Sequence, residues 1–219
     1  VFFFSQDMVP AVDENGAVVV EEKGRVFLSP NGHGGSLWAL RKSGALDEMK
    51  RRGIEEIFYF QVDNPLVEIA DPVFLGHHSL TGAQMSSKVL PKRDPEEKVG
   101  VVAVIDGKYG VIEYSDLAPE LRYAKRPDGT LLFNDGSIAI HFIRRDFVES
   151  VTDGELALPF HLAKKSIPSI DPRTLEKRPV KGVKFETFVF DALAFTKKSV
   201  VLQVDRADEF APIKNAEGE

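Results

Sequence analysis

Three positions in the sequence carry residue types that could together hold a nucleotide. Gln6 follows the apolar run at residues 1–4, the glycine-rich segment PNGHGG spans residues 30–35, and Asp63 ends the apolar segment at residues 57–62. In an open α/β sheet ligands bind outside the carboxyl ends of the strands, so we expect these positions at one crevice. A glutamine amide can pair with a base edge, glycine N–H groups can face a ligand, and a carboxylate can hold Mg²⁺ on a phosphate.

Each of these signals also has an ordinary structural explanation. A glycine cluster such as the one around Gly32 more often forms a tight turn, and an Asp-Asn-Pro sequence, as at residues 63–65, is more often a turn or a helix cap. Gln6 alone indicates nothing. Lys184 and Lys214 would most often be surface lysines. The interpretation as a nucleotide site therefore depends on finding these residues together in one chain, and none of them supports it alone.

Apolar patterning predicts the elements that would position these residues. The segment at residues 57–62 is nearly all apolar and aromatic, which is typical of a central strand covered on both faces. Gly44 is expected to break or bend the first helix, and Pro72 suits the first turn of the second. Strands are predicted at residues 1–6, 17–22, 25–30, 57–62, 84–90, 99–106, 108–116 and 199–206, and helices at residues 36–53, 71–82, 182–198 and at the end of the otherwise irregular segment 126–151. Strands alternating with helices indicate an α/β fold with a mixed sheet.

Composition limits the class of protein. The chain has 219 residues, of which 43% are hydrophobic and 28% charged, as in a globular protein with a core. A net charge of −6 with scattered lysines and arginines argues against a nucleic-acid surface. The sequence contains no cysteine, which excludes disulfides and thiolate chemistry, and no apolar run long enough to span a bilayer. We therefore expect a cytoplasmic protein without a membrane or nucleic-acid partner.

Several longer blocks occur in a definite order along the chain. They are QDMVPAV, PNGHGGSLWAL, GIEEIFYFQVDNPLVEIADPVFLG, VGVVAVIDGKYGVIEYSD, LLFNDGSIAIHF, GVKFETFVFDALAF and DEFAPIKNA. Together they resemble the UDP-N-acetylglucosamine pyrophosphorylase group of UDP-sugar pyrophosphorylases over essentially the whole chain. The resemblance implies a GT-A-like nucleotidyltransferase fold, dependence on Mg²⁺, and transfer of a uridylyl group from UTP to a sugar 1-phosphate, which yields a UDP-sugar and pyrophosphate.

The resemblance also implies a set of site residues. Gln6 and Gly32 match positions that read the uracil, and His33 stands where the next family residue contacts the sugar. Asp63 matches the acid near the phosphates and the metal. The remaining matches are Gly100 at the N-acetyl group, Glu113 and Tyr114 at the sugar hydroxyls, Ser137 at a sugar-binding position, and the phosphate-binding lysines Lys184 and Lys214. Asp63 and the two lysines are thus the expected catalytic residues.

The sequence departs from the family pattern at three points. The glycine-rich GGxGTRLG-type loop that cradles the triphosphate would lie before Val1, so residues 1–219 are interpreted as a single catalytic-domain fragment that is inactive alone. His33 and Ser137 replace asparagines of the family. The favoured substrate is N-acetylglucosamine 1-phosphate. A UDP-glucose or broad-specificity UDP-sugar pyrophosphorylase and a non-catalytic nucleotide-sugar-binding fragment remain alternatives, and the oligomeric state is left open.

Overall fold

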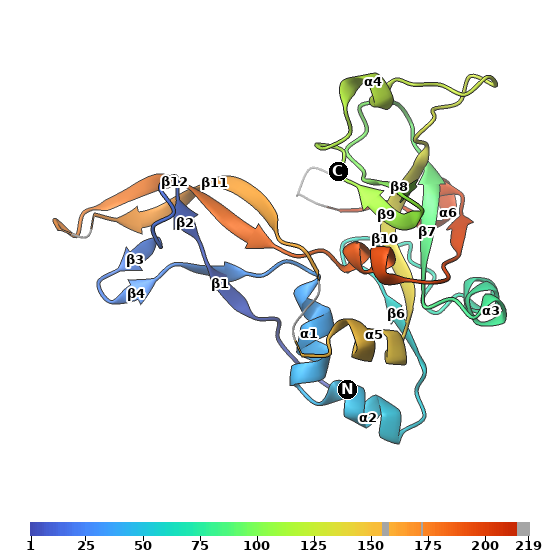
Figure 1. Ribbon diagram of the computed structural model, residues 1–219, viewed down its shortest axis with the longest axis horizontal. Coiled ribbons are helices and arrows are strands. Elements are labelled where there is room, and N and C mark those ends of the chain that lie inside the picture. Colours follow the sequence, from blue (N-terminus) through green and yellow to red (C-terminus); the bar gives the residue numbers. More distant parts are fainter. Residues whose placement is uncertain (155–157, 172, 214–219) are drawn as a thin grey trace. The chain divides into compact units, whose positions relative to one another are not determined.

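A computed structural model describes residues 1–154, 158–171 and 173–213 (Figure 1). The chain divides into two compact units, which we describe separately: unit 1 comprises residues 1–48 and 151–191, and unit 2 comprises residues 49–150 and 192–219. None of the helices in the described ranges has the length and apolar character needed to cross a membrane.

Unit 1 is built on short antiparallel strands and one long β-hairpin. Its strands are β1 (Met8–Pro10), β2 (Val12–Asp13), β3 (Val20–Glu22), β4 (Arg25–Val26), β5 (Leu28–Pro30), β11 (His161–Ile170) and β12 (Lys177–Glu186). β11 and β12 pair over their full length as the ribbon seen in Figure 1, and β2 pairs with β12. Ala11, Val19 and Ile167 form one buried cluster of this unit, and Phe27 and Val180 pack against it.

Unit 2 is built on a mixed sheet of six strands in the order β13-β7-β10-β8-β9, with β6 also paired to β10. The strands are β6 (Glu56–Tyr59), β7 (Met85–Pro91), β8 (Val101–Ile105), β9 (Lys108–Ile112), β10 (Asp135–Arg144) and β13 (Val201–Gln203). β13 runs parallel to β7, whereas the other pairs are antiparallel, so the predicted mixed sheet is confirmed.

The helices are short. They are α1 (Gly35–Lys42), α2 (Ala45–Arg51), α3 (Pro72–Thr81), α4 (Pro119–Arg122), α5 (Arg145–Val151), α6 (Arg206–Glu209) and the 3₁₀-helix η1 (Val189–Phe195). The predicted break at Gly44 between α1 and α2 is confirmed, because that residue has φ +78°, a conformation that glycine adopts readily. Phe74 of α3 packs on Leu90, Ile138 and Phe142, which places α3 against the sheet of unit 2.

Local signals with a clear physical mechanism bound two of these elements, and the predicted place of Pro72 is confirmed. Asp71 caps α3 by accepting a hydrogen bond from the N–H of Val73, Pro72 occupies the first turn, and Gly82 ends the helix with φ +65°. Asp106 and Gly107 have φ values of +50° and +78°, as a two-residue turn between β8 and β9 requires.

Four expected elements are wrong. Residues 1–6 form no strand, and the chain enters its first strand at Met8. β6 is only half-buried, and within the described residues it pairs with β10 alone, so it is not a central strand. The segment expected to be irregular contains β10, a central strand. The helix expected at residues 182–198 is instead the second half of β12 followed by η1.

Two physical reasons account for the larger errors. In β10 a register shift between Ser137 and His141, with Ala139 at φ +57°, interrupts the alternation that identifies a strand. In β12 the aromatic residues suggested a helical period. Pairing at every position with β11 determines the structure there, because side-chain periodicity is a weaker constraint than a complete hydrogen-bonded ladder.

Candidate functional site

Gln6 and the glycine loop, which were both expected to read a base, lie together in unit 1. The Nε2 of Gln6 donates a hydrogen bond of 3.0 Å to the carbonyl oxygen of Gly32 and lies 3.4 Å from Oδ1 of Asn31. The NH2 group of Gln6 thereby holds this side chain against the glycine loop.

The glycines of this loop pack against the segment that follows β12. A Cβ at Gly32 would lie 2.3 Å from the carbonyl oxygen of Thr187, and one at Gly34 would lie 2.8 Å from the backbone nitrogen of Phe188. Backbone hydrogen bonds of 2.8 Å join Thr187 to Asn31 and Gly34 to Thr187. On this side of the loop the protein backbone fills the space that a side chain would need, and the expectation that the loop also faces a ligand stays a prediction.

His33 is held neutral in an aromatic environment. Its Nδ1 accepts a hydrogen bond of 3.1 Å from the N–H of Val189, and its ring stacks on Phe188 with centroids 5.0 Å apart. Burial, with a smaller effect of the nearby His161, lowers the pKa of His33 from 6.5 to about 4. With Nδ1 acting as the acceptor, the neutral ring carries its proton on Nε2.

A second histidine completes this layer. The rings of His161 and Phe188 lie 4.4 Å apart, and Nε2 of His161 lies 2.8 Å from Oδ2 of Asp191. Burial raises the pKa of Asp191. His78 and His141 are buried and bonded to Ser86 and Ser87, and Nε2 of His78 also lies 2.9 Å from Oε2 of Glu56.

Lys184 lies half-buried on β12 of unit 1, opposite Ala163 of β11. Its Nζ sits 5.2 Å from the centre of the Phe27 ring. A cation–π contact of this kind contributes about 0.5–1 kcal/mol at a partly exposed site, so a phosphate could replace it without a large loss. The ammonium group is thus held in place by a weak interaction.

Three residues expected at the sugar meet in unit 2. The N–H of Ser137 donates a hydrogen bond of 2.8 Å to the carbonyl oxygen of Gly100. A Cβ at Gly100 would lie 3.1 Å from Oε1 of Glu113 and 2.7 Å from Cγ1 of Val111. The Oγ of Ser137 is buried and has no hydrogen-bond partner among the described residues. Tyr114, 41% exposed, follows Glu113 in the chain.

Asp63 follows β6 and is half-buried in unit 2. Its carbonyl oxygen accepts a hydrogen bond of 2.8 Å from the N–H of Ile213. The neighbouring Asn64 is 5% exposed; its Nδ2 donates to the carbonyl oxygen of Glu209 at 2.7 Å, and its Oδ1 accepts from the N–H of Ala211 at 3.0 Å. Residues 63 and 64 are thereby fastened to residues 209–213, whereas Lys214 lies outside the described residues.

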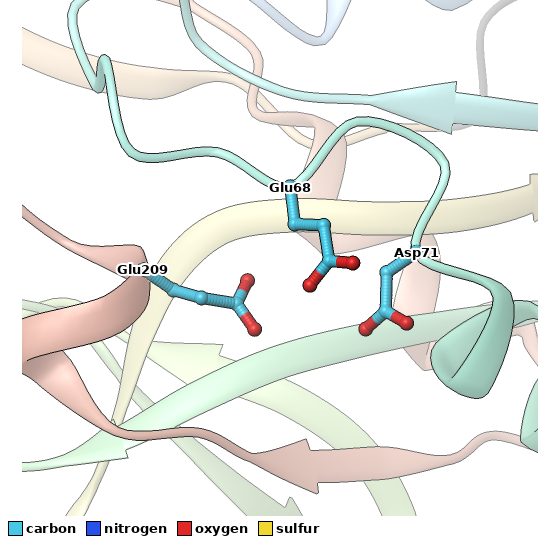
Figure 2. A group of neighbouring side chains, drawn as sticks. All are labelled: Glu68, Asp71 and Glu209. Carbon is cyan, nitrogen blue, oxygen red and sulfur yellow. The ribbon is translucent and has the colours of Figure 1, made fainter.

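A cluster of acidic side chains lies beside this attachment. Carboxylate oxygens of Glu68, Asp71 and Glu209 lie within 4.8 Å of one another, and Figure 2 shows the three groups converging. Lys88 supplies the cation: its Nζ lies 2.7 Å from Oδ2 of Asp71 and 2.6 Å from both carboxylate oxygens of Glu209. Sequence reasoning missed this group, and the only signal was a lysine inside the buried strand at residues 85–91.

The predicted site residues are divided between the units. Unit 1 holds Gln6, Gly32, His33 and Lys184, and unit 2 holds Asp63, Gly100, Glu113, Tyr114 and Ser137. The expectation that Gln6, Gly32 and Asp63 line one crevice stays a prediction.

Comparison with known proteins supports the resemblance seen in the sequence. The sequence model of a family described as UTP-glucose-1-phosphate uridylyltransferase matches residues 1–218. Human UDP-N-acetylhexosamine pyrophosphorylase-like protein 1 is 44% identical over 220 residues, which are 99% of this chain and 43% of the human protein. UDP-N-acetylglucosamine pyrophosphorylase of Saccharomyces cerevisiae is 37% identical over 223 residues, which are 99% of this chain and 47% of the yeast protein.

The solved structures agree. The crystal structure of uridine diphosphate N-acetylglucosamine pyrophosphorylase from Trypanosoma brucei, in complex with an inhibitor, matches with a TM-score of 0.86 and 33% identity. The match covers 100% of this chain and 45% of that chain. The expected nucleotidyltransferase-like α/β fold is confirmed, and the chain spans somewhat less than half the length of the relatives named here.

Proposed function

The chain belongs to the UTP-glucose-1-phosphate uridylyltransferase family, and from this premise we propose that the protein transfers a uridylyl group from UTP to a sugar 1-phosphate. The products are a UDP-sugar and pyrophosphate. The preferred acceptor in this proposal is N-acetylglucosamine 1-phosphate. The activity is assigned to the full-length protein, because the chain covers 43% of the length of its human relative.

The observation that carries the proposal is the meeting of Gly100, Glu113 and Ser137. They come from separate segments of the sequence, yet the N–H of Ser137 bonds to the carbonyl oxygen of Gly100, and a carboxylate oxygen of Glu113 lies beside Gly100. A carboxylate can accept hydrogen bonds from two adjacent sugar hydroxyls. The buried Oγ of Ser137 still has its hydrogen-bonding capacity available among the described residues. Such groups suit a sugar better than an apolar ligand.

The base would bind in unit 1. Gln6 and Gly32 are already joined by a hydrogen bond of 3.0 Å, so the amide and the loop are pre-organised relative to each other. In our proposal both read the uracil edge, and the neutral His33 is assigned to the sugar, as the family resemblance implies. A neutral imidazole at this position adds no positive charge that would compete with the lysines for the phosphates.

The chemistry requires two anions to approach each other. A phosphate oxygen of the sugar phosphate attacks the α-phosphorus of UTP, the new P–O bond forms in line with the bond that breaks, and pyrophosphate leaves. Catalysis of this kind depends on positioning and charge neutralisation rather than on a covalent step with the protein. We assign the neutralisation to Lys184 and Lys214, whose ammonium groups would contact the phosphates.

Asp63 is suited to hold Mg²⁺. Among residues 1–154, 158–171 and 173–213, no hydrogen bond or ion pair engages the Asp63 carboxylate, whose backbone is instead fixed through Ile213. Mg²⁺ commonly binds through one or two carboxylates together with substrate phosphates, and when bound it would neutralise charge on UTP. The cluster of Glu68, Asp71 and Glu209 is less suited, because two of its carboxylates already form ion pairs with Lys88.

A pyrophosphate-release assay on the full-length protein tests the proposal. UTP is supplied with N-acetylglucosamine 1-phosphate, glucose 1-phosphate or both in competition. We expect both sugars to react and the N-acetyl sugar to be preferred by at most about two orders of magnitude, because the serine and histidine substitutions alter hydrogen bonds worth roughly 1–3 kcal/mol.

A single reversion sharpens this test. Ser137→Asn restores the family's amide at the sugar position and should increase the preference for the N-acetyl sugar. Rejection of N-acetylglucosamine 1-phosphate together with turnover of glucose 1-phosphate would establish the UDP-glucose alternative. No pyrophosphate release with any sugar 1-phosphate would contradict the proposed function.

A further inference from the structure

We propose that Lys88 is a positioning residue of the transfer site, which holds the Asp63 loop in place through the segment at residues 205–213. The inference rests on the function proposed above, because it concerns the loop to which we assign the metal-binding carboxylate.

Lys88 is a charged side chain in the centre of unit 2. The residue is 0% exposed, and it lies on β7, six of whose seven residues are buried. The side chains of its partners Asp71 and Glu209 are 9% and 11% exposed. Burial of three charges is costly, and two carboxylates against one ammonium group leave a net negative charge. Without Lys88, these carboxylates would repel each other.

Each carboxylate fixes a different element. Asp71 is anchored at the start of α3, where its Oδ1 accepts a hydrogen bond of 2.8 Å from the N–H of Val73. Glu209 ends α6, a helix of a single turn, which cannot be stable by itself. Lys88 therefore connects α6, which is not stable alone, to the start of α3.

The attachment continues from Glu209 to Asp63. The carbonyl oxygen of Glu209 accepts from Asn64, the side chain of Asn64 accepts from the N–H of Ala211, and the N–H of Ile213 donates to the carbonyl oxygen of Asp63. The ammonium group thus acts on the backbone of Asp63 through Glu209 and three hydrogen bonds. Residue 213 also precedes Lys214 in the sequence.

Stability alone gives no reason for a lysine here. Buried ion clusters can often be replaced by apolar residues of similar size without loss of stability, so their retention fits a requirement for a defined position. A methionine at residue 88 would fill a similar volume, but it could not hold Glu209 at 2.6 Å. We therefore expect this substitution to leave the apolar core of unit 2 packed, while the segment at residues 205–213 is no longer held in one orientation.

The experiment compares Lys88→Met with Ser87→Ala in the full-length protein. Ser87 lies beside Lys88 on the same strand and forms a buried hydrogen bond of 2.9 Å to His141, and within the described residues its hydroxyl forms no hydrogen bond to Asp71 or Glu209. We measure amide hydrogen exchange, kcat and the KM values for UTP and N-acetylglucosamine 1-phosphate. In Lys88→Met we expect at least tenfold faster exchange at Ala211 and Ile213, at least tenfold lower kcat, and KM values within threefold of wild type.

In Ser87→Ala, exchange at Ala211 and Ile213 and kcat should stay within twofold of wild type. Should Lys88→Met not fold, Glu209→Gln gives the same test with milder effects, because Lys88 then retains Asp71. If Lys88→Met exchanges faster at Ala211 and Ile213 but keeps its kcat, Lys88 has a purely structural role and the proposal is overturned. Unchanged exchange at these two amides would also overturn it. If the wild type shows no transfer at all, the proposed function fails, while the exchange data still report separately on the attachment.

Discussion

Substitution of Gly32 by alanine should destabilise unit 1 for two separable reasons. Gly32 has φ +82°, and a left-handed conformation of this kind costs an alanine roughly 1–2 kcal/mol. In addition, its Cβ would lie 2.3 Å from the carbonyl oxygen and 2.5 Å from the nitrogen of Thr187, both of which belong to the backbone. Overpacking against atoms that cannot turn aside typically costs about 1–3 kcal/mol. The expected total for Gly32→Ala is therefore about 2–5 kcal/mol.

Gly24 provides a matched control in the same unit. It has φ +76° in the turn between β3 and β4, and a Cβ there would meet nothing within 4 Å. Gly24→Ala shares the backbone penalty but not the collision, so it should cost only about 1–2 kcal/mol.

Urea denaturation of wild type, Gly24→Ala and Gly32→Ala measures how much free energy of unfolding each substitution removes. The KM for UTP should also rise in Gly32→Ala alone, because the carbonyl oxygen of Gly32 holds the amide of Gln6. Equal losses of stability in the two variants would refute the argument that close packing on Thr187 requires the glycine.

The contacts of unit 1 support three further predictions. Gln6→Glu replaces the donor to the Gly32 carbonyl by a carboxylate oxygen, so the KM for UTP should rise about tenfold in steady-state kinetics, with an unchanged KM arguing against a role at the base. Burial lowers the pKa of His33 from 6.5 to about 4, so the unfolded state is protonated first as the pH falls below about 6.5. The free energy of unfolding should then decrease by up to about 3 kcal/mol between pH 6.5 and 4. Urea denaturation at each pH measures this dependence, and His33→Gln should remove the decrease that His33 causes. Lys184→Met should reduce kcat/KM by a factor of about 10²–10³, whereas Lys181→Met, an exposed lysine on the same strand, should leave it within twofold; equal values for both would return Lys184 to an ordinary surface role.

The parts of the fold that were predictable from sequence depend on short-range chemistry. The cap at Asp71, the turn at Asp106 and Gly107, and the break at Gly44 each follow from the conformational preference of one or two residues. Such preferences act over a few bonds, and distant partners do not override them.

The parts that were not predictable depend on distant partners. β12 is a strand because β11 pairs with it at every position, and β10 is a strand despite its bulge because β6, β7 and β8 pair with it. None of these pairings can be read from the local pattern of apolar residues. The expected helix at residues 182–198 failed for this reason.

The candidate site follows the same rule. The residue types of Gln6, Gly32 and Asp63 suggested a nucleotide, but only the resemblance to a family brought Gly100, Glu113 and Ser137 into consideration. The structure then placed these three together. Neither the residue types nor the family resemblance identified Lys88, because its partner Glu209 lies 121 positions away and a single lysine in a strand does not indicate its partner.

The fate of a label at the α-phosphorus of UTP tests the central claim most directly. Full-length protein is incubated with Mg²⁺, α-labelled UTP and N-acetylglucosamine 1-phosphate, and the products are separated. Attack of the sugar phosphate on the α-phosphorus predicts that the label appears in UDP-N-acetylglucosamine, accompanied by an equal amount of unlabelled pyrophosphate. Label recovered only in UTP, or in UMP without a UDP-sugar, would contradict uridylyl transfer.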